Sequence, residues 1–286
     1  MKNKKNGKKT IKILITMLAV ILLIIVYFLI PFSPLKLDFE KMVSTEIAKN
    51  TEVSGNFTLE EIEDLPLPVR KYFIYCGYIG KPKMQYMKAV YSDVDFHLSA
   101  DKPALKIDYT QYNFVNEPVR IAFINASMFG IPFQGLDSFV SGKGEMKGVI
   151  AKTLTLFSET GSEMDIACLV TVLSECLIVP SMALQQYISW ESIDDTQAKA
   201  TISYYGITAS GIFTFAENGE MVSFTTEDRW AVATDGTKTQ TSWSIYVSDY
   251  MEKNGIKLPT IFKAVWHYDS GDSIYFASDN CEIEYH

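Results

Sequence analysis

The chain has 286 residues, enough for one large or two small domains, and a formal net charge of −8. Six of its 26 basic residues are lysines within the first 12 positions, so the remainder holds 20 basic and 34 acidic residues, a net charge of −14. Binding to nucleic acid or to an anionic lipid surface requires clustered positive charge. The composition therefore argues against both of these partner classes.

Residues 11–30 form an almost wholly apolar run, about 20 residues long, which as a helix would cross roughly 30 Å of hydrocarbon. The lysines before it, with no acidic residue among them, predict a cytoplasmic N-terminus. A cleaved signal peptide is the main alternative, but its apolar core is usually only ~7–15 residues long and a small-x-small site should follow. We therefore expect residues 1–10 to be a cytoplasmic basic tail. Residues 11–30 are expected to be an uncleaved signal anchor in the cell membrane.

Residues 31–58 contain prolines and show no strong periodicity, and we expect them to form a stalk. Thr58 and Glu61 have the spacing of a capping box, which predicts a helical turn after Thr58. From Met84 onward apolar residues alternate with polar ones, for example over residues 105–114, as half-buried strands do. Residues 59–286 are therefore expected to be a single extracytoplasmic β-rich domain.

Short turns separate the predicted strands. Asn218-Gly219, between the strand patterns of residues 207–215 and 221–228, predicts a tight hairpin. Residues 130–144 are rich in glycine and serine and are predicted to be a loop. Sequential strands joined by short turns pair antiparallel, and the chain lacks the strand–helix alternation of Rossmann or TIM folds.

One convincing helix interrupts the strands at residues 162–187. Ser162 and Asp165 have capping-box spacing, and the apolar positions that follow leave little polar face, which predicts burial. Pro180 is expected to end the helix, and Ser181 to cap a second short one that runs to Tyr187. The predicted fold class is mainly β with a central helix (α+β). It is a large curved antiparallel sheet or half-barrel with a helix on its concave face, preceded by an N-terminal transmembrane helix.

Four cysteines lie on the expected extracytoplasmic side, where disulfides can form. Cys168 and Cys176 are separated by about 12 Å along one helix, too far to bridge. A link between Cys76 and Cys281 stays open as an alternative, but buried free thiols are the favoured interpretation.

The set of segments that follows carries a resemblance to a known family. It comprises Leu67-Pro68-Val69-Arg70-Lys71-Tyr72-Phe73, Gly142-Lys143-Gly144-Glu145-Met146, Val179-Pro180-Ser181-Met182-Ala183-Leu184, Trp190-Glu191, Phe213-Thr214-Phe215, Glu227-Asp228-Arg229, Ala264-Val265-Trp266 and Ile274-Tyr275-Phe276. Over about residues 60–285 the chain resembles a family of uncharacterised membrane-anchored bacterial proteins, described only as a domain of unknown function. The plan is also similar to the half-barrels of lipoprotein carriers, which hold acyl chains between sheet and helix. This resemblance implies a fold and an apolar ligand as expectations.

Signatures of catalysis are absent from the sequence. It contains no G-x-S-x-G, H-E-x-x-H, P-loop or G-x-G-x-x-G motif, and no C-x-x-C pair. Three histidines occur, and the structural interpretation of His97 and His267 is favoured over a catalytic one. Glu191, Asp194 and Asp195 lack the spacing of a calcium loop and are expected to be a solvated turn. No cofactor, metal or catalytic residue is predicted, and an enzyme is the less favoured class.

Aromatic residues concentrate in the alternating segments, so either a solid core or an apolar cavity between sheet and helix is possible. In the second case four residues would line the mouth of the cavity: Met182, Leu184, Tyr187 and Trp190. Glu191 and Arg229 are two further candidates, either as a structural ion pair or as ligand contacts.

Three functional hypotheses follow, in descending order. The first is a membrane-anchored extracytoplasmic protein that binds an apolar or lipid-like ligand between sheet and helix. The second is an envelope protein-interaction module with a solid core. The third is an unrecognised hydrolase.

Overall fold

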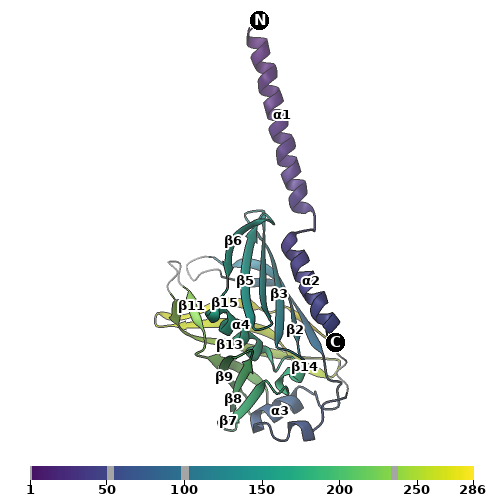
Figure 1. Ribbon diagram of the computed structural model, residues 1–286, viewed down its shortest axis with the longest axis vertical. Coiled ribbons are helices and arrows are strands. Elements are labelled where there is room, and N and C mark those ends of the chain that lie inside the picture. The colour runs from purple at the N-terminus through teal and green to yellow at the C-terminus, as the bar shows by residue number, and fades with distance from the viewer. Residues whose placement is uncertain (1, 50–54, 98–102, 233–237) are drawn as a thin grey trace.

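The alternating segments form one large antiparallel sheet of 14 strands in the computed structural model, which describes residues 2–49, 55–97, 103–232 and 238–286 (Figure 1). The path across the sheet is β6-β5-β4-β3-β2-β1-β15-β14-β13-β10-β9-β8-β7, and β16 pairs with β1 off this path. The sheet is not closed, because β6 and β7 end the path without pairing to each other. The expected fold class is confirmed.

The sheet has two wings that meet where β1 pairs with β15 and β16. The first wing contains β1 (Tyr86–Phe96), β2 (Leu105–Phe114), β3 (Val119–Met128), β4 (Ile131–Val140), β5 (Lys143–Ile150) and β6 (Leu154–Glu159). The second contains β7 (Ile188–Ser192), β8 (Gln197–Tyr204), β9 (Ile207–Phe215), β10 (Met221–Thr226), β13 (Ser242–Lys253), β14 (Ile256–Tyr268), β15 (Gly271–Ser278) and β16 (Cys281–Tyr285). A separate hairpin joins β11 (Trp230–Val232) to β12 (Lys238–Gln240).

The predicted hairpin at Asn218-Gly219 is present between β9 and β10. The predicted loop over residues 130–144 is wrong, because β4 occupies most of it and pairs with both β3 and β5. The glycine that favoured a loop is required by packing. A Cβ at Gly135 would lie 3.0 Å from the Ile124 side chain on the neighbouring strand.

The central helix is split into α4 (Ser162–Glu175) and α5 (Pro180–Ala183). Pro180 does not end the first helix but begins the second, where its missing N–H costs nothing. The predicted capping box is also wrong. The Asp165 carboxylate instead accepts hydrogen bonds from the Lys143 ammonium at 2.9 Å and the Gly144 N–H at 2.7 Å, which fix α4 to β5.

Helix α4 lies between the two wings and contacts β4 and β5 on one side and β8 and β9 on the other. Five side chains of this segment are wholly buried: Leu169, Val170, Val172, Leu173 and Cys176. They belong to the main apolar core, together with aromatic residues of both wings. The space between α4 and the sheet is therefore filled with side chains.

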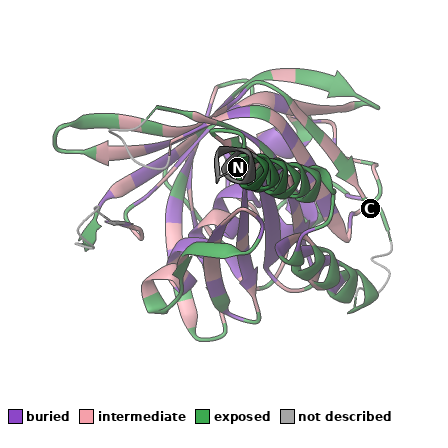
Figure 2. Ribbon diagram, turned by 90° about the horizontal axis from the view of Figure 1, so that it is seen from above, coloured by how far each residue is buried: buried purple, intermediate pink, exposed green. Residues whose placement is uncertain are grey.

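The N-terminal region contains α1 (Lys2–Leu29) and α2 (Pro34–Lys49). Among the described residues, α1 contains the one stretch long and apolar enough to cross a membrane, and none of that stretch is buried (Figures 1 and 2). Helix α2 packs on β3 and β4, on the face opposite α4, through Leu35, Phe39 and Val43. The segment expected to be a stalk thus has one face against the sheet, and its residues 50–54 lie outside the described residues.

The link from α2 to the sheet contains a short 3-10 turn, η1 (Glu60–Ile62), and α3 (Leu67–Tyr75). The capping box predicted at its start is confirmed, since the Thr58 hydroxyl and the Glu61 carboxylate each accept the other's backbone N–H at 3.3 Å. Figure 1 shows α3 at the end of the sheet farthest from α1.

Candidate functional site

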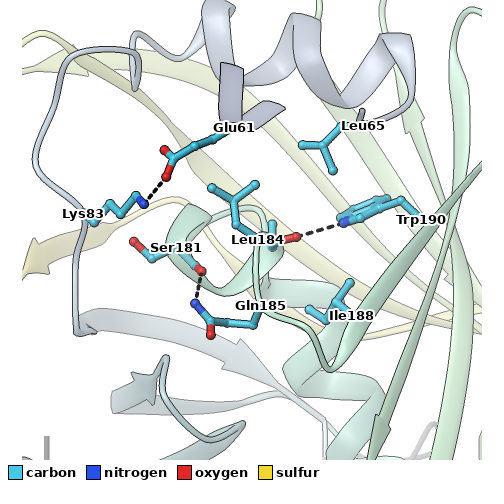
Figure 3. Close-up of a pocket in the computed structure, with 9 residues that line it drawn as sticks. Glu61, Leu65, Lys83, Ser181, Leu184, Gln185, Ile188 and Trp190 are labelled. Carbon is cyan, nitrogen blue, oxygen red and sulfur yellow. Dashed lines mark hydrogen bonds and ion pairs between the residues drawn. The ribbon is translucent and has the colours of Figure 1, made fainter. Parts of the chain in front are cut away.

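A cleft of about 340 Å³ opens at the end of the sheet distant from α1. It lies between α5, the edge strand β7 and the turn that joins η1 to α3 (Figure 3). The residues that line it are Glu61, Leu65, Lys83, Ser181, Ala183, Leu184, Gln185, Ile188 and Trp190. We call it the α5–β7 cleft.

The walls of the cleft are held by hydrogen bonds. The Ser181 hydroxyl accepts the Met84 N–H at 2.9 Å, which attaches α5 to the segment before β1. The Trp190 indole N–H donates to the Ala183 carbonyl at 2.9 Å, and its ring lies 5.3 Å from that of Phe213. The indole therefore forms a fixed wall, whose polar atom is already satisfied and whose apolar surface is left for contact.

The polar residues of the cleft lie at its rim. Lys83 and Glu61 form an ion pair there, and Glu61 is itself held by the capping box with Thr58. The Gln185 side-chain N–H donates to the Ser181 carbonyl at 3.0 Å. An apolar floor with a balanced ion pair at its edge suits an amphipathic group better than an ion.

The structure brings some of the sequence-predicted residues to this cleft. Leu184 and Trp190 line it, whereas Met182 is wholly buried beneath it. Tyr187 is half-buried, and its hydroxyl donates to the Val115 carbonyl at 2.6 Å. Burial raises the pKa of this phenol well above its usual value, so it remains a neutral donor.

The structure does not pair Glu191 with Arg229. Glu191 is exposed on β7 and lies 3.6 Å from the ammonium of Lys199. Arg229 lies in the second wing with its guanidinium 4.2 Å from the centre of the Trp243 ring and 5.3 Å from that of Trp266. Its Nε is buried without a hydrogen-bond partner in the described residues. The two residues thus belong to different places.

A buried polar network between α4 and the first wing was not anticipated from the sequence. Arg120, on β3, is only 5% exposed. Its guanidinium donates to Glu175 at 2.9 Å, at the end of α4, and to Asp137 at 2.7 Å, on β4. The side chains of Gln111 and Asn113 donate to the same Glu175 oxygen at 2.9 and 2.7 Å. The one basic residue within an apolar strand pattern was the available sign of this network.

The network has a structural explanation. A buried guanidinium between two carboxylates is stable only when hydrogen bonds replace its lost hydration. The two carboxylates raise the pKa of Arg120 against the opposing effect of burial, so it stays charged. Because Arg120, Asp137 and Glu175 come from three elements, their contacts fix α4 in register with β3 and β4.

A second polar chain lies on the other wing, at Ser244, His267 and Asp272. The His267 Nε2 lies 2.8 Å from the Ser244 hydroxyl and its Nδ1 lies 2.7 Å from Asp272. This is the order of groups in a serine hydrolase triad. Ser244, however, is 1% exposed and also bonds to the Thr225 hydroxyl at 2.8 Å. A substrate cannot reach this hydroxyl, so we interpret the chain as a structural bridge between β10, β13 and β14.

The favoured interpretation of the cysteines is confirmed, since all four are free. Burial raises the pKa of Cys76 and of Cys281 to about 12, which keeps both thiols protonated at neutral pH. Within the described ranges no group of three or more His, Cys, Asp or Glu residues is arranged to hold a metal ion.

Comparison with known proteins identifies the family. Residues 55–278 match the family described as "Family of unknown function (DUF6544)", and the chain belongs to that family. The expected resemblance to a domain of unknown function is confirmed. No curated protein matches the chain.

Two solved structures resemble it. A LolA superfamily protein from Nitrosomonas europaea matches with a TM-score of 0.38 and 11% identity, covering 80% of this chain and 91% of that chain. A DUF1329 family protein from Desulfovibrio piger matches with a TM-score of 0.33 and 11% identity, covering 81% and 94%.

Proposed function

We propose that this DUF6544 protein is a membrane-anchored extracytoplasmic protein that binds the apolar part of a ligand in the α5–β7 cleft. The observation that carries the proposal is the floor of that cleft. Leu65, Leu184, Ile188 and Trp190 present apolar surface to an opening that solvent can reach. Ligand sites combine a mainly apolar lining with a few placed polar groups, and the Lys83–Glu61 pair and Gln185 supply those groups.

The anchor is supported by α1, whose apolar stretch packs on nothing within the described residues. A soluble protein rarely exposes so large an apolar surface. The lysines before this stretch support a cytoplasmic N-terminus, and with it an extracytoplasmic sheet. In that orientation the α5–β7 cleft opens away from the membrane, toward a ligand that approaches from the extracytoplasmic space.

The packing supports a shallow site rather than a deep one. The sequence favoured a cavity between the central helix and the sheet, but α4 is surrounded there by buried side chains such as Leu169, Leu173 and Cys176. The cleft lies at the mouth that Leu184 and Trp190 were expected to form. We therefore place the ligand against α5 and β7, outside the core.

The test uses the full chain in lipid nanodiscs with palmitic acid that carries a photoreactive diazirine. After irradiation, mass spectrometry maps the cross-linked peptides. We expect cross-links within residues 181–190, reduced about tenfold in Leu184→Glu, because a charge in the floor opposes the apolar contact by ~1.4 kcal/mol or more. Ile74→Glu is the matched control, since Ile74 is 57% exposed and does not line the cleft. Cross-links confined to α1, or unchanged in Leu184→Glu, would overturn the proposal.

A second candidate, recognition of an extended peptide, is favoured by the edge strand β7. The Ser203 N–H donates to the Tyr187 carbonyl and the Ile193 N–H to the Gln197 carbonyl. Hydrogen-bonded pairs alternate in antiparallel strands, so the backbone groups of Trp190 and Ser192 point to the open edge. A peptide that adds to this edge would place alternate side chains over the cleft.

Panning of a short-peptide display library on the full chain in nanodiscs tests this candidate. Ser192→Pro removes one outward N–H and is tolerated at an edge. We expect it to abolish binding of selected peptides, whereas Ser192→Ala, which keeps the N–H, should not. Peptides that bind both variants equally would exclude addition to β7.

A further inference from the structure

Two hairpin turns of the first wing lie beside the C-terminal end of α1. The Lys152 ammonium, in the turn between β5 and β6, donates to the α1 carbonyls of Tyr27 at 2.8 Å and Ile30 at 2.5 Å. The Ala151 N–H donates to the Pro132 carbonyl at 2.8 Å, which joins this turn to the β3–β4 hairpin. Figure 1 shows the same ends of β5 and β6 rising to the base of α1.

The surface of these turns is apolar. Residues 121–136, which span the β3–β4 hairpin, contain no charged residue in a chain that is otherwise rich in acids. Four large apolar side chains are exposed here: Phe129 by 101%, Ile131 by 37%, Leu154 by 63% and Leu156 by 53%. We call these four residues the apolar tip.

Phe129 is an unfavourable choice for a turn in water. It has φ of 54° and is followed by Gly130 with φ of 81°, so both central residues of the hairpin turn are left-handed. Such turns prefer Asn-Gly or Gly-Gly, and a bulky residue with positive φ is strained. The position therefore combines an unfavourable backbone conformation with complete exposure of an aromatic ring. Neither is explained by packing within the chain.

We propose that the apolar tip enters the interfacial region of the same bilayer that α1 crosses. This inference rests on the proposed anchor, because the apolar run of α1 ends at Ile30, where Lys152 contacts it. The contact places the tip at the level where hydrocarbon meets headgroups, the region in which exposed aromatic and aliphatic side chains are stabilised. The partner is a lipid surface, recognised through apolar area and without a cationic patch.

The consequence is a fixed orientation of the sheet. Helix α1 alone would leave the extracytoplasmic part free to tilt about one connection. A second attachment through the apolar tip, with Lys152 bound to the helix end between them, holds the long axis of the sheet upright. The α5–β7 cleft, at the other end, is then held away from the membrane.

The test measures the depth of single labels in the full chain, reconstituted in vesicles of phosphatidylcholine and phosphatidylglycerol. Phe129→Cys and, separately, Leu154→Cys are labelled with the fluorophore NBD, and the unsubstituted chain gives the background from native cysteines. Quenching by iodide in the water is compared with quenching by doxyl-labelled lipid. Ile74→Cys, on α3 at the opposite end, is the matched control.

We expect both tip labels to emit at shorter wavelength than the control, with iodide quenching reduced severalfold and doxyl-lipid quenching increased severalfold. The double variant Phe129→Asn with Leu154→Cys suits the positive φ of the turn while removing the aromatic ring. It should increase the iodide quenching of the Leu154→Cys label.

Two results would overturn the inference in distinguishable ways. Extraction of the chain from the vesicles by alkaline carbonate would refute the anchor and with it the tip. Retention of the chain, with tip labels as open to iodide as the control label, would refute the tip alone.

Discussion

Replacement of Arg120 by leucine gives the sharpest test of what holds α4 to the sheet. Arg120 is 5% exposed and donates to Glu175 at 2.9 Å, to Asp137 at 2.7 Å and to Gln111 at 3.3 Å. Arg120→Leu leaves two carboxylates near each other without their cation. Breaking a buried ion pair on one side costs about 3–5 kcal/mol, because the remaining charge is buried and uncompensated.

The coupling between the partners separates this mechanism from a simple loss of packing. Arg120→Leu combined with Glu175→Leu removes both charges, so the double variant should be more stable than the sum of the two single effects predicts. A coupling free energy of about 1.5–3 kcal/mol is expected for residues in one such network. Asp137 limits the recovery, since it loses its own guanidinium partner in both cases.

The assay is urea unfolding of the full chain in detergent micelles, followed by tryptophan fluorescence and extrapolated linearly to water. Lys88→Leu is the matched control, because Lys88 pairs with Glu284 at 3.1 Å on the surface and should change the free energy of unfolding by less than about 0.5 kcal/mol. The reasoning is refuted if Arg120→Leu costs less than about 1 kcal/mol, or if the effects of Arg120→Leu and Glu175→Leu simply add.

Three further predictions concern other buried groups. Burial raises the pKa of Cys76 from 9.0 to about 12, so the folded chain keeps a proton that the unfolded chain loses between these values. The free energy of unfolding should therefore fall with rising pH in that window, by up to about 1.4 kcal/mol per pH unit more than in Cys76→Ala. Gly144→Ala should destabilise the fold by about 1–3 kcal/mol in the urea assay, because its Cβ would lie 2.5 Å from the Met164 carbonyl oxygen on α4. A fluorophosphonate probe should not label Ser244 in the folded chain, because its hydroxyl is buried and bonded to His267.

Each has a control and a contrary outcome. Equal pH slopes for the parent chain and Cys76→Ala would show that this thiol does not stay protonated on folding. For the glycine, Gly80→Ala has free space around its Cβ and a positive φ, so it reports backbone strain alone. An equal loss at Gly80 and Gly144 would contradict the steric argument. Labelling of Ser244 that disappears in His267→Ala would revive the hydrolase hypothesis.

The sequence determined the features that depend on near neighbours. The apolar run of residues 11–30, the alternating strand patterns and the Asn218-Gly219 turn are local, because periodicity and turn conformation are set within a few residues. The capping box of Thr58 and Glu61 was predictable for the same reason, since both partners lie within one turn. These features were sufficient for the antiparallel, mainly β fold class.

Tertiary structure decided what depends on residues far apart. Asp165 had a local partner in prospect at Ser162, but the Gly144 N–H and the Lys143 ammonium offered better geometry from β5. Residues 130–144 read as a loop because glycine has poor strand propensity, yet Gly135 is needed where β4 lies against Ile124.

The candidate sites divide in the same way. Leu184 and Trp190 could be placed at the mouth of a cleft because both lie within a few residues of α5. Arg120 and Glu175 are separated by 55 positions, and their pairing arises only when α4 docks on β3. A charge partner at that distance leaves no periodic trace in the sequence, because the chain between the two residues sets their approach through packing and not through spacing.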